Sequence, residues 1–237
     1  MNIVSLKDMR SMREVYFPKV LETVTLEKNC KVLDIGCAFG YFLKLCDQLG
    51  CDTYGLDISD YAISQARRET KATLYVHDAN KGLSMFCDNT FGLIVLFDVI
   101  EHLDSPYLLL KETRRVLRRD GKLVITTPNL TALGRFLKKI LGKEHSWYGY
   151  IDKTHKNLFT PSSLRLLSEK AGFGIMRLET PFHPLPRIMQ KIANKTKLGG
   201  QIWLIGTKRD VEICAQYCPT DAQHDSKSRK FWSIHRK

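Results

Sequence analysis

The stretch ValLeuAspIleGlyCysAlaPheGly, residues 32–40, decides the fold of this chain. Its first residues are apolar, as in a buried strand, and the glycines at 36 and 40 then let the backbone turn tightly and approach a ligand. A second short strand ends at Asp57, where a carboxylate can accept hydrogen bonds from both hydroxyls of a ribose. Strand, glycine turn, helix, strand and acid in this order predict a nucleoside-binding crevice at the carboxyl ends of the strands.

Two classes of nucleoside cofactor could occupy such a crevice. Dinucleotides need the fingerprint G-x-G-x-x-G, whereas this turn carries Gly36, Ala38 and Gly40. Asp34 stands immediately before the turn, where its carboxylate would repel a pyrophosphate and attract an ammonium group. Because S-adenosylmethionine has an ammonium and no phosphate, electrostatics favours this methyl donor over a dinucleotide.

The surrounding sequence alternates between short apolar runs and amphipathic runs, which is the pattern of a parallel sheet with crossover helices. Seven runs indicate strands, at 31–35, 53–56, 73–76, 93–97, 122–127, 174–178 and 202–206. Four amphipathic runs indicate helices, at 41–49, 59–69, 105–119 and 160–171. The sequence therefore predicts an α/β fold with a doubly wound, Rossmann-like sheet.

Residues 31–129 resemble the core of the class I S-adenosylmethionine-dependent methyltransferases, especially their broad small-molecule branch. The first motif of that family, D-h-G-x-G-x-G, stands here as AspIleGlyCysAlaPheGly, with Ala38 in place of the middle glycine. The runs AspValIleGluHisLeu (98–103) and ThrHisLysAsnLeuPheThrPro (154–161) are similar to later motifs of this branch. The resemblance extends over about residues 30–207.

The resemblance implies a place for each part of S-adenosylmethionine. The methionine portion would lie along the first motif, at Asp34, Gly36, Cys37 and Gly40. Asp57 would hold the ribose hydroxyls. The adenine would lie between two apolar side chains with its amino group at a carboxylate, a set made by Ile58, Ala79 and Asp78. The floor near the reacting sulfonium would consist of Phe97, Asp98 and Val99.

The family also implies a seven-stranded, mostly parallel sheet with its last strand antiparallel, which agrees with the seven strands expected here. We expect one methyltransferase domain over 1–207, with a helical lid made by acceptor-side segments 129–160 and 180–200, and a basic, partly disordered tail over 208–237. The expected reaction is methyl transfer from S-adenosylmethionine to a small molecule, at oxygen, with S-adenosylhomocysteine as product. Similar chains act on sugars, quinone or lipid precursors and secondary metabolites.

A hydroxyl acceptor would need a general base, whereas the cofactor supplies the methyl reactivity. Histidines and tyrosines in or near the segment expected over the acceptor are the candidates: His102, His145, His155, Tyr148 and Tyr150. We select His155, because imidazole titrates near neutral pH and this residue lies in that segment. The alternative is a structural role in which His155 ties the inserted segment to the domain.

The charge of +12 lies entirely in the C-terminal half. Residues 1–127 carry 17 basic and 17 acidic side chains, whereas residues 128–200 carry 13 basic and four acidic ones. Basic amphipathic stretches at 130–143 and 187–197 could contact an anionic membrane surface or serve as an ordinary lid. Alternatives are an RNA or protein methyltransferase that uses the basic half, although nucleic acid is the less favoured partner, and a non-catalytic cofactor-binding module.

Composition predicts a globular protein in a reducing compartment. Apolar residues make up 43% of the 237, and no apolar run approaches the roughly 18 residues that a membrane span needs. The N-terminal stretch lacks the apolar core of a signal peptide, and seven scattered cysteines show no disulfide spacing. We therefore expect a cytoplasmic protein, with possible peripheral contact at a membrane. Cys214, Cys218 and His224 have loose metal-like spacing, but we expect free thiols and no metal site there.

Overall fold

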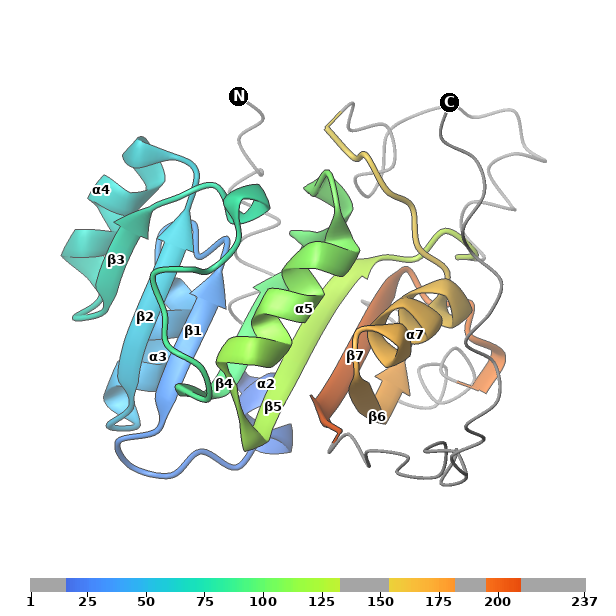
Figure 1. Cartoon of the computed structure of the whole chain (residues 1–237), viewed down its shortest axis with the longest axis horizontal. Coiled ribbons are helices and arrows are strands. Elements are labelled where there is room, and N and C mark those ends of the chain that lie inside the picture. Colours follow the sequence, from blue (N-terminus) through green and yellow to red (C-terminus); the bar gives the residue numbers. More distant parts are fainter. Residues whose placement is uncertain (1–15, 133–153, 182–194, 210–237) are drawn as a thin grey trace, which may run out of the picture.

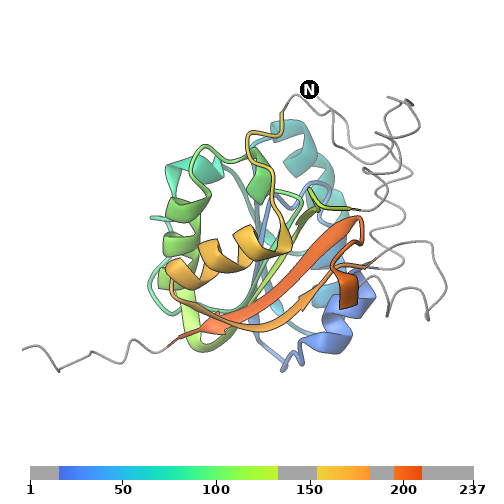
Figure 2. The same cartoon turned by 90° about the vertical axis from the view of Figure 1, so that its right-hand side faces the viewer.

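The computed structural model describes residues 16–132, 154–181 and 195–209. These residues form one seven-stranded sheet with helices against both faces (Figures 1 and 2). In chain order the elements are α2 (Phe17–Thr23), β1 (Lys31–Ile35), α3 (Tyr41–Gln48), β2 (Asp52–Asp57), α4 (Asp60–Glu69), β3 (Thr73–Val76), η2 (Ala79–Lys81), β4 (Phe91–Phe97), η3 (Ile100–His102), α5 (Pro106–Val116), β5 (Leu117–Pro128), α7 (Pro161–Lys170), β6 (Phe173–Glu179) and β7 (Gln201–Lys208).

The strand order is β3-β2-β1-β4-β5-β7-β6, and the first five strands in the chain pair parallel. β7 runs antiparallel to both β5 and β6, so the expected reversal of the last strand is confirmed. The order changes direction at β1, whose two neighbours are β2 and β4. In open sheets of this kind, ligands bind at such a switch point, outside the carboxyl ends of the strands.

Two apolar cores lie on opposite faces of the sheet because successive side chains of a strand point to opposite sides. Leu33 and Ile35 of β1 pack in the core that contains α5 and α7, whereas Val32 packs in the core that contains α2 and α3. β4 contributes side chains to both cores, which explains why its sequence is apolar without alternation. A smaller cluster joins α3 to α4 through Leu43 and Ile63.

Local signals in the sequence place most helix ends correctly. Ser59 caps α4, with its hydroxyl accepting from the backbone N–H of Ala62, and Thr160 opens α7 with a reciprocal capping box. Gly50 and Gly172 follow α3 and α7 in the left-handed region, at φ 77° and 96°.

The helix expected over 105–119 ends three residues early, at Val116. Leu117 is fully buried and pairs with Phe91 of β4, and the Thr90 N–H donates to the Val116 carbonyl at 2.7 Å. Burial of Leu117 and pairing with β4 therefore override the helical pattern of the following arginines. The register between β4 and β5 then shifts between Phe91 and Leu93.

Helix α2 has no counterpart among the expected elements. It is only seven residues long, and Pro18 in its first turn suits a helix start. Phe17 and Val20 are buried against the sheet, where the Phe17 ring contacts the rings of Phe42 and Phe97 at centroid distances of 5.3 and 5.0 Å.

Asn129, fully buried just after β5, ties three stretches of chain together. Its side-chain amide donates to the carbonyls of Lys197 and Gly199 at 3.0 and 2.7 Å, and its backbone N–H donates to the Gly200 carbonyl at 2.9 Å. It also forms an isolated bridge with Phe159. Both ends of the expected lid segment 129–160 and the C-terminal end of the segment 180–200 are therefore joined at one point beside the sheet.

The expected lid falls largely outside the described residues. The basic stretch at 130–143 is described only to Ala132, that at 187–197 only from Lys195, and the tail only to Arg209. His145, Tyr148, Tyr150 and the cysteine–histidine group at 214–224 also lie outside the described residues. Among the residues that the structure describes, no helix is long and apolar enough to cross a bilayer.

Candidate functional site

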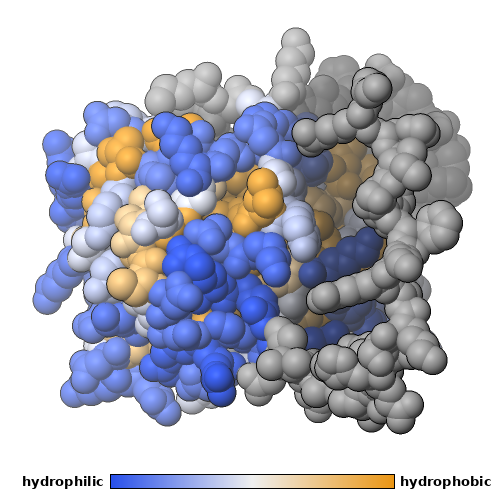
Figure 3. Space-filling view, in the orientation of Figure 1, coloured by the Kyte–Doolittle hydropathy of each residue, from blue (hydrophilic) through white to orange (hydrophobic). Residues whose placement is uncertain are grey.

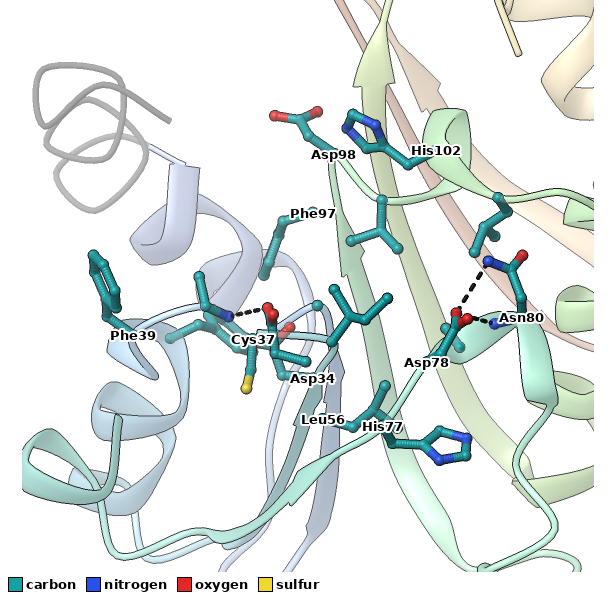
Figure 4. A pocket seen from close by; sticks show the side chains of 18 of the residues that line it. Asp34, Cys37, Phe39, Leu56, His77, Asp78, Asn80, Phe97, Asp98 and His102 are labelled. Carbon is teal, nitrogen blue, oxygen red and sulfur yellow. Dashed lines mark hydrogen bonds between the residues drawn. The ribbon is translucent and has the colours of Figure 1, made fainter. Parts of the chain in front are cut away.

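A cavity of about 420 Å³ opens at the carboxyl ends of β1, β2, β3 and β4, beside the switch point of the sheet (Figure 4). This volume is within the range of sites for small molecules and cofactors. The side chains and backbone that line it come from the strand ends, α2, α3, η2 and η3: Phe17, Asp34, Gly36, Cys37, Ala38, Phe39, Tyr41, Phe42, Leu56, Asp57, Ile58, His77, Asp78, Ala79, Asn80, Phe97, Asp98, Val99, His102, Leu103 and Lys156.

The cavity brings together every cofactor residue that the sequence predicts except Gly40. Gly40 lies outside the lining and begins α3 at φ 73°. A Cβ there would come within 2.9 Å of the Thr70 side chain and 3.1 Å of that of Ala66. The contacts of Gly40 therefore point to a packing role, in which it lets α3 approach α4 closely.

The glycine turn is held against the end of β2 by backbone hydrogen bonds. Gly36 and Cys37 both donate to the Leu56 carbonyl, at 2.7 and 3.0 Å. Gly36 has φ 77°, and a Cβ there would overlap the side chain of Val99. Glycine is therefore required at 36 both for the backbone conformation and for the approach of the β4 end.

Asp57 organises the same turn from the other side. Its carboxylate accepts from the backbone N–H of Ala38 at 2.9 Å and from that of Ser59 at 2.8 Å. A carboxylate offers about four lone-pair positions, so two remain for the hydroxyls of a ribose. The structure thus gives Asp57 a structural task in addition to the binding task that the sequence predicts.

Asp34 provides the test of whether the site suits an ammonium group. Its side chain is 2% exposed, and within the described residues its Oδ1 has no hydrogen-bond partner. Burial, reinforced by the negative charge of Asp57, raises the pKa of Asp34 to about 8. A cationic group in the cavity would satisfy the carboxylate, so the residues present fit the charge pattern of S-adenosylmethionine.

The end of the cavity expected to hold adenine is built by β3 and η2. Asp78 caps η2, with its Oδ1 accepting from the backbone and side-chain amides of Asn80 at 2.9 and 3.0 Å (Figure 4). Ile58 is 70% exposed at the cavity, so its apolar surface is available to an aromatic ring. Ala79 lines the same region.

Two carboxyl groups lie just after β4, of which Asp98 is half-buried and Glu101 is buried. Asp98 adopts φ 53°, and its Oδ1 accepts from the Thr126 hydroxyl at 3.1 Å and, with the amide oriented to its acceptors, from Gln201 at 3.2 Å. Burial raises the pKa of Asp98 to about 6, although these two donors oppose the shift. Glu101 is 1% exposed, and burial together with the charge of Asp98 raises its pKa well above the ordinary value.

The predicted base His155 lies beside the cavity lining, whereas His102 is part of it. The two imidazoles meet edge to face with ring centroids 4.7 Å apart. One side-chain nitrogen or oxygen atom from each of Glu101, His102 and His155 lies within 4.8 Å of the other two. The structure therefore joins the Glu-His pair after β4 to the later histidine motif, which the sequence alone could not do.

Several lining residues were not singled out from the sequence. Phe17 comes from the unpredicted helix α2, and Lys156 reaches the cavity while its ammonium pairs with Asp104 at 2.6 Å. Phe39 and Tyr41 stand on either side of Gly40 in the sequence, with their ring centroids 6.1 Å apart. Their position next to the motif was a usable signal, since residues that follow such a turn face the ligand.

The fold and this crevice define a class of protein, the Rossmann-like methyltransferases, and a comparison with known families agrees. The model of the family described as "Methyltransferase domain" matches residues 9–178, so the chain belongs to that family. S-adenosylmethionine is the cofactor of this class, and the buried carboxyl group of Asp34 suits its ammonium group.

Several individual relatives carry the same name. The chain is 28% identical over 156 residues to a protein named ubiquinone biosynthesis O-methyltransferase from Pelagibacter ubique, covering 64% of this chain and 65% of that protein. It is 29% identical over 122 residues to the mitochondrial protein of that name from Schizosaccharomyces pombe, covering 47% and 44%. The chain thus spans about half to two thirds of the length of such relatives.

Solved structures share the fold. A protein from Archaeoglobus fulgidus described as a SAM-dependent methyltransferase superposes with a TM-score of 0.64 at 23% identity, covering 86% of this chain and all of that one. The PH0226 protein from Pyrococcus horikoshii gives a TM-score of 0.62 at 25% identity, covering 88% and 94%. These likenesses support the seven-stranded architecture.

Proposed function

We propose that this protein transfers a methyl group from S-adenosylmethionine to a hydroxyl oxygen of a small molecule, leaving S-adenosylhomocysteine. The observation that carries the proposal is the buried Asp34 carboxyl at the switch point, whose Oδ1 has no partner within the described residues. It lies in the same cavity as Asp57, so one ligand with an ammonium and a ribose would satisfy both acids.

The cofactor supplies an activated methyl group when bound, and the protein has to orient and shield it. Asp34 would bind the ammonium, Asp57 the ribose, and Asp78 the adenine amino group. Phe97 and Val99 supply an apolar floor that excludes water at the reacting end. The acceptor oxygen must be held in line with the methyl group at about 3–3.5 Å.

We infer that the acceptor is a hydroxylated ring related to a quinone precursor. Two observations support this acceptor class: several of the relatives that match are named ubiquinone biosynthesis O-methyltransferase, and the cavity carries the aromatic residues Phe17, Phe39 and Tyr41. Aromatic side chains favour the face or edge of another ring. A sugar acceptor would instead call for several hydrogen-bonding side chains around the ring.

The test incubates purified protein with methyl-labelled S-adenosylmethionine and a cell extract, followed by separation into soluble, lipid, RNA and protein fractions. Label in a small molecule of the soluble or lipid fraction, with methyl ether chemistry, supports the proposal. Label in RNA or protein would replace it with a macromolecular methyltransferase. Binding of S-adenosylhomocysteine without transfer to any fraction would favour a non-catalytic module.

We also propose a cytoplasmic location with peripheral contact at anionic membrane surfaces. The support is in the sequence, where apolar positions such as Leu133 and Leu137 alternate with Arg135, Lys138 and Lys139. The described surface on the α5 side is mainly hydrophilic with scattered apolar patches (Figure 3). A membrane contact would therefore use the basic stretches rather than this side.

A further inference from the structure

O-methylation of a hydroxyl leaves a proton to be taken up, and two titratable side chains face the cavity after β4. These are Asp98 and His102, which Figure 4 shows at one end of the pocket, with His77 and Asp78 at the other. The β4 end is also where the floor of the reacting methyl group is expected. A proton acceptor for the reaction should therefore come from this pair.

Asp98 accepts hydrogen bonds from residues of β5 and β7. Its Oδ1 accepts from the Thr126 hydroxyl and the Gln201 amide, and its backbone N–H donates to the Thr126 carbonyl at 3.1 Å. These donors oppose the effect of burial, which still leaves the pKa of Asp98 raised to about 6. They also hold its Oδ1 towards β5 and β7, on the side of the sheet.

His102 is held in the opposite way, by acceptors on one ring nitrogen. Its Nδ1 lies 3.2 Å from the Thr154 carbonyl oxygen and 3.1 Å from the Thr154 hydroxyl. A carbonyl oxygen can only accept a hydrogen bond, so its contact with Nδ1 is attractive only when Nδ1 carries a proton. The Thr154 hydroxyl must then also act as an acceptor from Nδ1. In the neutral ring this leaves Nε2 with a free lone pair, which is the tautomer that a general base requires.

Acidic and basic side chains both lie around His102. The titratable groups are Asp98 just after β4, Glu101 from η3, His155 and Lys156 from the segment before α7, and Asp104, which pairs with Lys156. Glu101 is buried, with its Oε2 accepting from Thr127 at 2.9 Å and its Oε1 without a hydrogen bond within the described residues. Glu101 therefore places a polar group close to both imidazole rings.

We propose that His102, through Nε2, is the general base of this O-methylation, and that the Thr154 carbonyl is the positioning group that fixes its tautomer. The assignment rests on the proposed function. The acceptor O–H gives its proton to Nε2 as the oxygen forms its bond to the methyl carbon, and the electron pair of the breaking carbon–sulfur bond stays on sulfur. The imidazolium then loses the proton to solvent. In this assignment His155 is not the base, and its ring packs edge to face against the ring of His102.

The first test compares the protein with His102→Asn, since asparagine can keep a donor near Thr154 but has no group in place of Nε2. The probes are catechol and the more acidic 4-nitrocatechol. We expect kcat for catechol to fall by about 10²–10⁴-fold, which is the usual contribution of a general base. The loss should be smaller for 4-nitrocatechol, because its hydroxyl ionises without help. Binding of S-adenosylhomocysteine should stay within about twofold, and His224→Asn is the matched control that should change neither quantity.

The second test reads the tautomer directly and requires no turnover. In protein labelled with ¹⁵N-histidine, the signals that disappear in His102→Asn should show a protonated Nδ1 and an unprotonated Nε2 above pH 7.5. The opposite tautomer would overturn the assignment, and so would equal losses of kcat for both phenols. Activity that EDTA abolishes and Mg²⁺ or Zn²⁺ restores would overturn it too, because an imidazole bound to a cation cannot take up the proton.

The two tests separate this inference from the proposed function. If S-adenosylhomocysteine fails to bind, or if labelled methyl groups reach only RNA or protein, the proposed function fails whatever the state of His102. If small-molecule hydroxyls are methylated but Nε2 carries the proton, the function stands and the base is another group. If neither phenol is an acceptor, the nitrogen spectrum alone decides the assignment.

Discussion

Binding of the cofactor should depend on pH through Asp34. Burial raises the pKa of this carboxyl to about 8 in the free protein, so it is mostly protonated at neutral pH. An ammonium group pairs with the anion and not with the acid. The affinity for S-adenosylhomocysteine, which keeps the ammonium and is chemically stable, should therefore rise as the pH rises towards 8.

The size of the effect follows from the position of that pKa. From pH 6 to pH 7 the ionised fraction of a group titrating near 8 rises from about 1% to about 10%, while an α-amino group stays largely protonated. The dissociation constant should therefore fall about tenfold, which corresponds to about 1.4 kcal/mol. Calorimetric titrations at the two pH values in buffers of matched ionic strength measure this ratio, and the heats in buffers of different ionisation enthalpy count the proton released.

Asp34→Asn supplies the control, since an amide does not titrate. We expect the variant to bind weakly and with the same constant at both pH values. The folded-state pKa of Asp34 lies above the ordinary value of 3.8, so its contribution to stability is present at low pH and is lost as the pH rises through about 8. The variant should therefore lose less stability than the natural protein between pH 5 and pH 8. Equal dissociation constants for the natural protein at pH 6 and pH 7 would refute the assignment of Asp34 to the ammonium.

Three further outcomes are expected. Asp57→Ala should weaken S-adenosylhomocysteine binding at least tenfold, and unchanged affinity in calorimetry would exclude the ribose contact. The same change leaves two backbone N–H groups without their acceptor, so it should lower the free energy of unfolding by about 1–2 kcal/mol. Gly36→Ala should cost about 2–4 kcal/mol in denaturant unfolding, from its positive φ and its overlap with Val99, and a cost below about 1 kcal/mol would contradict the close approach. Changing Lys138, Lys139 and Lys143 together to glutamine should reduce sedimentation of the protein with vesicles rich in phosphatidylserine. The proposed membrane contact is wrong if the natural protein never sediments with such vesicles.

Much of the fold could be predicted because its signals are local. The seven strands follow from apolar runs, and the ends of α4 and α7 from Ser59 and Thr160. The end of α5 could not be predicted, because it depends on Leu117 pairing with Phe91, 26 residues earlier in the chain. Helix α2 was missed for a similar reason, since seven residues with a proline carry little periodic signal and gain their stability from packing on the sheet.

In the candidate site, too, local signals could be predicted from the sequence and tertiary contacts could not. Residues at or just after the carboxyl end of a strand, such as Asp34, Asp57 and Asp98, could be placed from the order of motifs. The contact between His102 and Thr154 joins residues 52 positions apart, so no pattern within either motif shows which histidine faces the cavity. Gly40 matched the motif, but its use in packing against α4 becomes visible only with the tertiary structure.

The junction at Asn129 has a consequence for how such a protein can diversify. Its amide and backbone join the start of the segment after β5 to Phe159, beyond the far end of 133–153, and to Lys197, Gly199 and Gly200, after 182–194. A change of sequence or length within 133–153 can leave these bonds in place, because Asn129 and Phe159 lie outside that stretch. Selection for a new acceptor can therefore act on that stretch while the junction holds its two ends beside the donor-binding crevice, whereas loss of Asn129 would release them.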